Sequence, residues 1–249
     1  MSKYALLVGI NYRGTRAELK GCINDVQDMK NYLLQHRGYV EANITVLTED
    51  TEKKPTAANI LHGLSTLMLR GHTNGAKELW FHYSGHGSST RDNNGDEDDG
   101  MDETIVPLDY TRSGMITDDI LHDYIEHKPV GCEMICILDC CHSGTILDLK
   151  YQYKGGSNHS IENAHSRVPS GVIMLSGCMD TQTSADAHIG NKWSGAMTCS
   201  FIQAMGKYEY HPTCYQILDG MRNYLRENHY AQYPQLSSSH EIKDDTPFP

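Results

Sequence analysis

Short continuous runs of apolar residues recur along the chain and predict β-strands. The runs are rich in Val, Ile and Leu and do not alternate with polar residues, which is typical of a sheet covered on both faces. They lie at Tyr4–Ile10, Ile44–Leu47, Leu79–Tyr83, Met134–Leu138 and Val172–Leu175. The pattern therefore predicts a buried central sheet.

Two segments between these runs have the periodicity of an amphipathic helix, with apolar residues at three- and four-residue spacing. The second of them follows Pro55-Thr56, which is a good helix start. The apolar residues are Cys22, Val26, Met29 and Leu33 in the first segment and Ile60, Leu61, Leu64, Leu67 and Met68 in the second. Strands that alternate with helices predict an α/β fold, with a mostly parallel central sheet and helices on both faces.

Two stretches break this pattern. Thr90–Gly100 is polar and acidic, and Tyr151–Pro169 is rich in Gly, Ser, Asn and His without periodicity, so we expect the latter to be an exposed loop. Such a loop is either a tolerated insertion or a segment built to be cut, because nicking concentrates at loop tips. The sequence leaves both interpretations open. The basic residues that flank the loop or lie in it, and so mark possible processing sites, are Lys150, Lys154 and Arg167.

The chain has 249 residues, of which 39% are hydrophobic and 21% charged, a composition that excludes disordered and fibrous classes. Its formal net charge of −11 argues against nucleic acid and anionic lipid as partners. The N-terminal MSKYALLVGI is expected to be a strand rather than a secretory signal, and no apolar run is long enough to cross a membrane. Eight cysteines without an export signal are expected to be thiols in a reducing, cytoplasmic compartment.

Two of the predicted strands end in residues that suit nucleophilic catalysis. ELWFHYSGHG places His86 between two glycines, and MICILDCCHSGT places Cys141 at a turn. Functional groups collect at the carboxyl ends of strands in open α/β sheets, and glycine lets the backbone approach a substrate closely. A thiol becomes a good nucleophile when a neighbouring base favours its thiolate. We therefore expect Cys141 and His86 to form a catalytic pair.

Strand alternation separates Cys141 from the cysteines that precede it. Cys132, Cys136 and Cys140 fall on one face of the predicted strand and are expected to pack in the core. Four residues of a strand span about 13 Å. That is too far for thiolates that share one zinc ion, so a zinc hydrolase is disfavoured. His142 is a poor base for its neighbour because adjacent side chains diverge.

The pair YSGHG and DCCHSGT, in this order and about 55 residues apart, resembles the metacaspases, the caspase-like peptidases found outside animals. The resemblance continues through LLVGINY, LKGCINDVQDM, DGMDETIVPLDY, LSGCMDTQTSADA and WSGAMT. It implies a single caspase-like domain over residues 1–249. Residues 1–150 would form a large-subunit-like region, 151–169 a linker with a processing site, and 170–249 a small-subunit-like region. This order is similar to the type I arrangement, without the Pro/Gln-rich prodomain.

By position, the resemblance implies that Cys141 is the nucleophile and His86 the general acid/base. The backbone N–H groups of Cys141 and Gly87 would form the oxyanion hole. It also implies a pocket for Arg or Lys, made by Cys22, Asp25, Ser84 and Asp139. The chemistry agrees, because a buried carboxylate is costly unless it meets a cation. Two carboxylates should favour guanidinium or ammonium groups and reject Asp, although Asp25 taken alone suits a solvated helix face.

Seven of the twelve residues from Asp92 to Glu103 are acidic, which is the usual composition of a solvated loop. An EF-hand is excluded, because Glu97 stands where that loop needs glycine. Carboxylates from converging loops nevertheless suit a hard cation, and the resemblance implies that four aspartates bind an activating Ca²⁺. These are Asp102, Asp118, Asp119 and Asp148. Asp118 and Asp119 also suit the N-terminus of a helix.

We therefore expect a monomeric, calcium-activated cysteine endopeptidase that cleaves peptides after Arg or Lys, with autoprocessing, and that binds neither nucleic acid nor membranes. One alternative is a calcium-responsive binding or scaffold protein that keeps the fold with little turnover, against which the intact Cys/His pair argues. Another is a caspase-like peptidase of different specificity, against which Asp25 and Asp139 argue.

Overall fold

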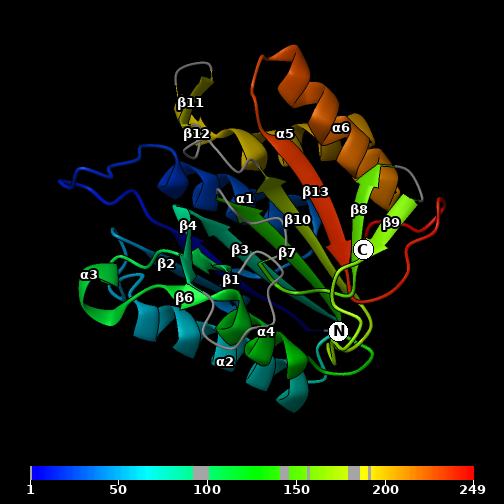
Figure 1. The fold of residues 1–249 in the computed structure, drawn as a ribbon, viewed down its shortest axis with the longest axis horizontal. Helices are drawn as coiled ribbons and strands as arrows, with labels where there is room; N and C mark the ends of the chain where they lie inside the picture. The colour runs from blue at the N-terminus through cyan, green and yellow to red at the C-terminus, as the bar shows by residue number, and fades with distance from the viewer. Residues whose placement is uncertain (1, 92–100, 141–145, 156–157, 179–185, 190–191) are drawn as a thin grey trace.

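The computed structural model describes residues 2–91, 101–140, 146–155, 158–178, 186–189 and 192–249, which build an eight-stranded sheet (Figure 1). The strand order is β2-β1-β3-β7-β10-β13-β8-β9. The bounds are β1 (Lys3–Gly9), β2 (Ile44–Thr48), β3 (Glu78–Ser84), β7 (Glu133–Asp139), β8 (Tyr151–Gly155), β9 (Asn158–Ile161), β10 (Val172–Cys178) and β13 (Tyr233–Ser238). The five strands from β2 to β10 run parallel, and the remaining pairs are antiparallel. The predicted mostly parallel sheet is confirmed.

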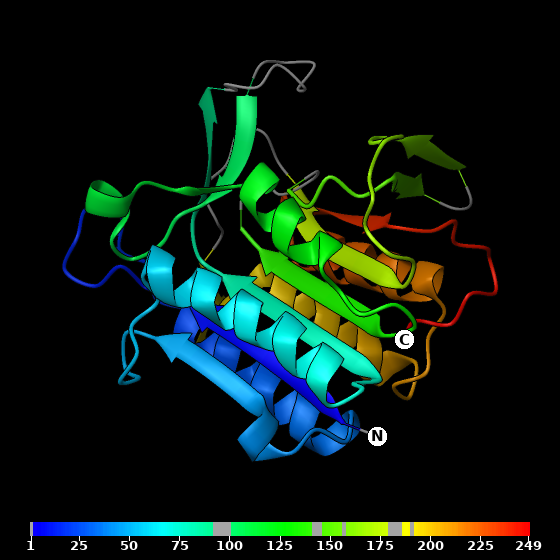
Figure 2. The ribbon, with the colours of Figure 1, turned by 90° about the horizontal axis from the view of Figure 1, so that it is seen from below.

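Helices cover both faces of this sheet, as predicted (Figures 1 and 2). One face carries α1 (Cys22–His36), α5 (Ala196–Lys207) and α6 (Cys214–Glu227), and the other carries α2 (Ala57–Thr73) and α4 (Asp118–Glu126). Side chains alternate between the two layers along β1. Leu6 and Val8 join the core under α2, whereas Leu7 joins the core under α1. A strand whose two faces are both buried needs an apolar residue at every position, which is why the runs are continuous.

The remaining elements are short. The described residues also form two small sheets. The pair β11–β12 lies by α1 and α5 (Figure 1), and β4 and β5 project away from the main sheet (Figure 2). The strands of the small sheets are β4 (Gly87–Arg91), β5 (Met101–Ile105), β6 (Ile116–Thr117), β11 (Asp186–Ile189) and β12 (Lys192–Gly195), and the short helices are α3 (Tyr110–Ser113) and a 3-10 turn at Glu41–Asn43. Among the described helices, none combines the length and the apolar character that crossing a bilayer requires.

The predicted strands and helices agree with the structure to within a few residues at their ends. The cysteines assigned to the core are buried, and Cys132, Cys136 and Cys140 are each at most 1% exposed. Strand alternation therefore located them correctly. Of the acidic stretch 90–100, residues 92–100 lie outside the described residues, and Thr90 and Arg91 belong to β4.

The prediction of an exposed loop over Tyr151–Pro169 is wrong for its first half. This part forms the hairpin β8–β9, and β8 pairs with β13 in the main sheet. Tyr153 is fully buried, and its hydroxyl accepts a hydrogen bond from Ile242 N–H at 2.6 Å. The segment has few aliphatic residues, so its strand character comes from pairing with a distant strand rather than from its own pattern. Residues 162–170 contain neither helix nor strand.

Candidate active site

The carboxyl ends of β3 and β7 lie side by side at one edge of the sheet. Ser84 pairs with Asp139 in the parallel register, and Gly85 N–H donates to the Asp139 carbonyl at 3.2 Å. His86 follows directly after this contact. The expectation that these two strand ends meet is therefore confirmed. Cys141 lies outside the described residues, together with the rest of 141–145.

The backbone of His86 is held by two tyrosines. Its N–H donates to the Tyr12 hydroxyl at 3.0 Å, and its carbonyl accepts from the Tyr83 hydroxyl at 2.7 Å. Gly85 is required at this turn, because an added Cβ would lie 2.6 Å from the Tyr83 hydroxyl oxygen and 3.0 Å from that of Tyr12. The tyrosines and the glycine together fix where the imidazole can lie.

The imidazole of His86 has a defined hydrogen-bond partner. Its Nε2 lies 2.7 Å from the Ala17 carbonyl, and its ring centroid is 4.8 Å from that of Tyr12. A carbonyl only accepts, so this contact requires the proton on Nε2 and leaves Nδ1 as the acceptor of the neutral ring. An imidazole oriented in this way is prepared to take a proton through Nδ1.

A groove of about 240 Å³ runs along the imidazole. Gly87, the expected oxyanion-hole residue, lies in its wall as the first residue of β4, where it pairs with Ile105. The lining residues are Tyr12, Ala17, His86, Gly87, Ser88, Val106, Tyr110 and Met115. The groove brings polar backbone and apolar side chains together beside the candidate base.

Two carboxylates, Asp25 and Asp139, are buried at the same edge of the sheet, with 0% and 3% exposure. We call them the carboxylate pair. Both border Gly195, where an added Cβ would lie 2.6 Å from Asp25 Oδ2 and would overlap Asp139 Oδ2. The expected partner Ser84 donates from Oγ to Asp25 Oδ2 at 2.7 Å. Cys22, the fourth expected pocket residue, is buried at the start of α1, one turn before Asp25.

The carboxylate pair has perturbed acidity. Burial, and next the negative charge of Asp139, raise the pKa of Asp25 to about 8, although hydrogen bonds from Ser194, Ser84 and Gly195 oppose the shift. Like charges in a site of low polarity resist ionising together. The pair therefore retains a proton near neutral pH as long as no cation compensates it.

Sequence reasoning missed three residues of this site, all from the WSGAMT segment, which spans the end of β12 and the start of α5. Ser194 Oγ donates to Asp25 Oδ1 at 2.6 Å, and Gly195 N–H donates to the two oxygens of the same carboxylate at 2.8 and 3.0 Å. Thr198 donates to Asp139 Oδ2 from both its N–H and its hydroxyl, each at 2.8 Å. The only signal for them was the motif itself.

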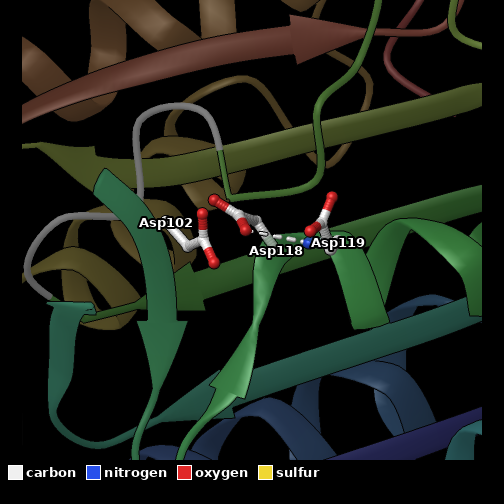
Figure 3. Close-up of side chains that lie close together, drawn as sticks. All are labelled: Asp102, Asp118 and Asp119. Carbon is white, nitrogen blue, oxygen red and sulfur yellow. Dashed lines mark hydrogen bonds between the residues drawn. The ribbon is translucent and has the colours of Figure 1, made fainter. Parts of the chain in front are cut away.

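A second acidic group lies at the start of α4. Asp102 comes from β5, and Asp118 and Asp119 form the first turn of the helix behind the N-cap Thr117 (Figure 3). One carboxylate oxygen from each of the three lies within 4.8 Å of the others. We call these residues the Asp102 cluster. The sequence expectation that they converge is met for three of the four aspartates.

Asp118 is the centre of the Asp102 cluster. Its carboxylate accepts from Glu103 N–H at 2.7 Å and from Asp119 N–H at 2.8 Å. Burial raises the pKa of Asp118 to about 6 in spite of these donors, and the charges of Asp102 and Asp119 add to the shift. An all-oxygen set of this kind matches the ligand preference of Ca²⁺.

Asp148, the fourth aspartate, is half-buried outside the Asp102 cluster. Its φ of +44° lies in the left-handed region, which is uncommon for a residue with a side chain. The preceding carbonyl, that of Leu147, lies 2.9 Å from Nδ1 of His122 on α4. Helix α4 therefore carries two residues of the Asp102 cluster and also contacts the backbone just before Asp148.

The three basic residues around the predicted linker differ in their surroundings. Lys150 is half-buried, with its ammonium 5.4 Å from the centroid of the Tyr151 ring. Lys154 belongs to β8. Arg167 lies beyond the hairpin, with its side chain 82% exposed and its Nε 3.2 Å from Glu126 on α4.

A family model described as the metacaspase, peptidase C14 domain matches residues 3–150, which is more than half of the chain. The chain belongs to the metacaspase family. Its members are cysteine-type peptidases, and this metacaspase domain is therefore a hydrolase by family. The match ends just before β8, so it includes both predicted catalytic residues and all four expected pocket residues.

Similarity to known metacaspases extends over almost the whole chain. It is 38% identical to Metacaspase-1 of Debaryomyces hansenii, with 96% of this chain and 65% of that protein aligned. It is 39% identical to Metacaspase-1 of Mycosarcoma maydis, with 98% of this chain and 72% of that protein aligned. The chain thus spans about two thirds of the length of these relatives, and slightly less in the first case.

Two solved structures share the fold of this metacaspase domain. Protein GSU0716 from Geobacter sulfurreducens superposes with a TM-score of 0.66 at 20% identity, over the whole of both chains. The structure named pro-sf-caspase-1 superposes with a TM-score of 0.55 at 11% identity, over 99% of this chain and 89% of that one. The caspase-like fold expected from the sequence is confirmed.

Proposed function

We propose that this metacaspase domain is a calcium-activated endopeptidase that cleaves after Arg or Lys. The observation that carries the specificity is the buried carboxylate pair. Asp139 ends β7, and Asp25 on α1 accepts from Ser84 at the end of β3, the strand that leads to His86. A guanidinium or ammonium group placed against Asp25 and Asp139 would compensate two buried negative charges at once. An Asp side chain would bring a third negative charge to the same place, which is strongly unfavourable.

The proposed reaction uses Cys141 and His86. The Cys141 thiol gives its proton to His86, and the thiolate attacks the scissile carbonyl while backbone N–H groups of Cys141 and Gly87 stabilise the oxyanion. His86 then protonates the leaving amine, and the C–N bond breaks to give a thioester. Water, deprotonated by His86, attacks the thioester and releases the acid and the thiol. The contact of His86 Nε2 with Ala17 supports this role, since it directs Nδ1 toward proton transfer.

The test of the proposed specificity is turnover of matched fluorogenic peptides that differ only in the residue before the cleaved bond. We expect kcat/KM for Arg- and Lys-ending peptides to exceed that for the citrulline-ending peptide by about 100-fold or more, because citrulline has the shape of Arg without its charge. We expect no turnover of the Asp-ending peptide. Equal rates for Arg and citrulline would contradict the assignment of Asp25 and Asp139 as the specificity site.

The calcium part of the proposal rests on the Asp102 cluster. Three carboxylates converge there, two of them almost fully buried, with 5% exposure for Asp102 and 2% for Asp118. Buried like charges are costly, and a divalent cation compensates them. Asp102 is on β5, which pairs with β4 next to His86, so an ion at the cluster would order the chain beside the groove.

We expect Ca²⁺ to raise both the melting temperature and the peptidase activity of the wild type, and Mg²⁺ to do neither because it demands a smaller octahedral site. Asp118→Asn should shift the calcium midpoint of both signals upward by about tenfold or more, since it removes a charged ligand. Asp123→Asn is the matched control, because Asp123 is exposed on the same helix. An unchanged midpoint in Asp118→Asn would refute the assignment.

The proposal includes self-cleavage in the linker. Arg167 is the best candidate of the three basic residues, because it is exposed and lies beyond the hairpin in a segment without helix or strand. A peptidase binds an extended segment of its substrate in its own groove. A strand that is hydrogen-bonded within a sheet would have to leave the sheet first. Mass spectrometry of the calcium-treated wild type should find a new C-terminus at Arg167. Cleavage only after Lys154 would contradict this choice.

A further inference from the structure

The imidazole of His82 is buried next to Thr198, which holds Asp139 of the carboxylate pair. His82 lies in β3, between Leu7 of β1 and Ile137 of β7 in the register, and is 0% exposed. Burial lowers the pKa of His82 to about 3, so the ring is neutral at physiological pH. A neutral imidazole still carries one donor and one acceptor, and each is costly to bury unless it is hydrogen-bonded.

The ring is linked to Asp139 through Thr198. Nε2 of His82 lies 3.2 Å from the Thr198 hydroxyl, and that hydroxyl donates its single proton to Asp139 Oδ2 at 2.8 Å. The hydroxyl must therefore accept from His82, which places the ring proton on Nε2. Thr198 N–H donates to the same carboxylate oxygen at 2.8 Å. The contacts form a directed chain from His82 to Thr198 to Asp139.

The other ring nitrogen, Nδ1, argues that a histidine stands here for its hydrogen bond to Thr198 and not only to fill space in the core. Nδ1 of His82 has no hydrogen-bond partner among the described residues, although it is buried. An orphaned buried acceptor destabilises a protein, and an apolar side chain of similar size would avoid that cost. The side that does have a partner is the Nε2 donor directed at Thr198.

We propose that His82 is a positioning residue for substrate specificity, which orients the Thr198 hydroxyl and through it the carboxylate of Asp139. This inference rests on the proposed cleavage after Arg or Lys. A carboxylate whose Oδ2 is held by two donors has one orientation, and directional recognition of a guanidinium depends on such an orientation. Without His82, the Thr198 hydroxyl loses the donor that fixes its rotation.

The test compares His82→Leu, which removes the donor, with His82→Gln, whose amide nitrogen reaches about as far from the backbone as Nε2. With the Arg-ending peptide, we expect His82→Leu to raise KM about fivefold with kcat nearly unchanged, as loss of one hydrogen bond predicts. The preference for Arg over citrulline should fall by a similar factor. His82→Gln should restore both quantities to within about twofold of the wild type.

The Thr198→Val variant tests whether His82 changes KM through the hydroxyl of Thr198. If His82 acts through Thr198, then His82→Leu should not change KM further in the Thr198→Val background. Additive effects in this background would overturn the proposal. So would a loss of melting temperature and kcat in His82→Leu that leaves KM unchanged, because core packing alone explains that result.

The wild type separates the two levels of the inference. A wild type that does not prefer Arg over citrulline overturns the proposed specificity, and the role of His82 with it. A wild type that prefers Arg, together with a His82→Leu variant of the same KM and the same preference, overturns only the role of His82.

Discussion

Replacing Cys141 by alanine is expected to lower kcat/KM for an Arg-ending peptide by roughly 10⁴-fold or more. The thioester cannot form without the sulfur of Cys141. Cys22, Cys132, Cys136, Cys140 and Cys214 are buried and so are poorly placed to replace it. Burial raises the pKa of the thiols of Cys132 and Cys214, and that of Cys136 lies even higher. The measurement is hydrolysis of the fluorogenic peptide at saturating calcium.

Two further variants make this result specific. Cys214→Ser is the matched control, because Cys214 is a buried thiol at the start of α6 that contacts the Pro247 carbonyl, and it should keep most of the activity. His86→Ala should cost nearly as much as Cys141→Ala, and the double variant little more, because the two residues act as one unit. If Cys141→Ala hydrolysed the peptide at the wild-type rate, the catalytic assignment would fall.

Asp25→Asn is expected to lower kcat/KM for Arg- and Lys-ending peptides by roughly 100-fold. The amide keeps the shape of the carboxylate and can still accept from Ser194 and Gly195, so the loss reports on charge. Activity toward the citrulline-ending peptide should change much less. Asp28→Asn, one turn further along α1, is the matched control and should keep the preference for Arg.

The same variant is expected to be more stable than the wild type at alkaline pH. The pKa of Asp25 rises from 3.8 to about 8 on folding, through burial and then the charge of Asp139. A carboxyl with a raised pKa favours folding while it is protonated, and this contribution is lost as the pH rises from about 4 through about 8. The amide that Asp25→Asn introduces has no proton to lose at these pH values.

The melting temperatures of the two proteins should therefore be similar near pH 4 and diverge as the pH rises toward 8 and above. At pH 8 and above, the free energies of unfolding of the two proteins should differ by on the order of a few kcal/mol, because the pKa shift of Asp25 is large and its carboxyl is buried. Calcium is omitted from this measurement, and the other titrating groups, such as Asp118, contribute alike to both proteins. If the wild type were the more stable protein at pH 9, ionisation of Asp25 beside Asp139 would not destabilise the fold, and the argument would be wrong.

The opposite effects of Asp25→Asn have a common cause. Burial and mutual repulsion make the carboxylate pair unfavourable in the protein alone. Under the proposed specificity, a cation between its members would compensate this cost. Asp25 and Asp139 therefore keep a destabilising arrangement that a basic substrate side chain would relieve.

Local sequence pattern determined the central architecture. The five parallel strands could be located because a strand buried on both faces is apolar at every position, as in ELWFHYS and EMICILD. The same regularity assigned Cys136 and Cys140 to the core. It also placed His86 and Asp139 at strand ends on the same edge of the sheet, since parallel strands end at the same edge. That these two strands are neighbours came from the structure.

Tertiary structure alone decided the features that depend on residues far apart in the chain. The hairpin β8–β9 exists because β13 provides its partner, and the short alternation at Tyr151 and Tyr153 does not by itself predict a strand. Ser194 bonds Asp25 from 169 positions away, and His82 reaches Asp139 only through Thr198 of another element. Periodicity reports which face of an element is buried, whereas a hydrogen bond between elements depends on how those elements are placed in space. For that reason the sequence by itself located the five parallel strands and the candidate catalytic residues, and only the folded chain showed the antiparallel strands and how the carboxylate pair is held.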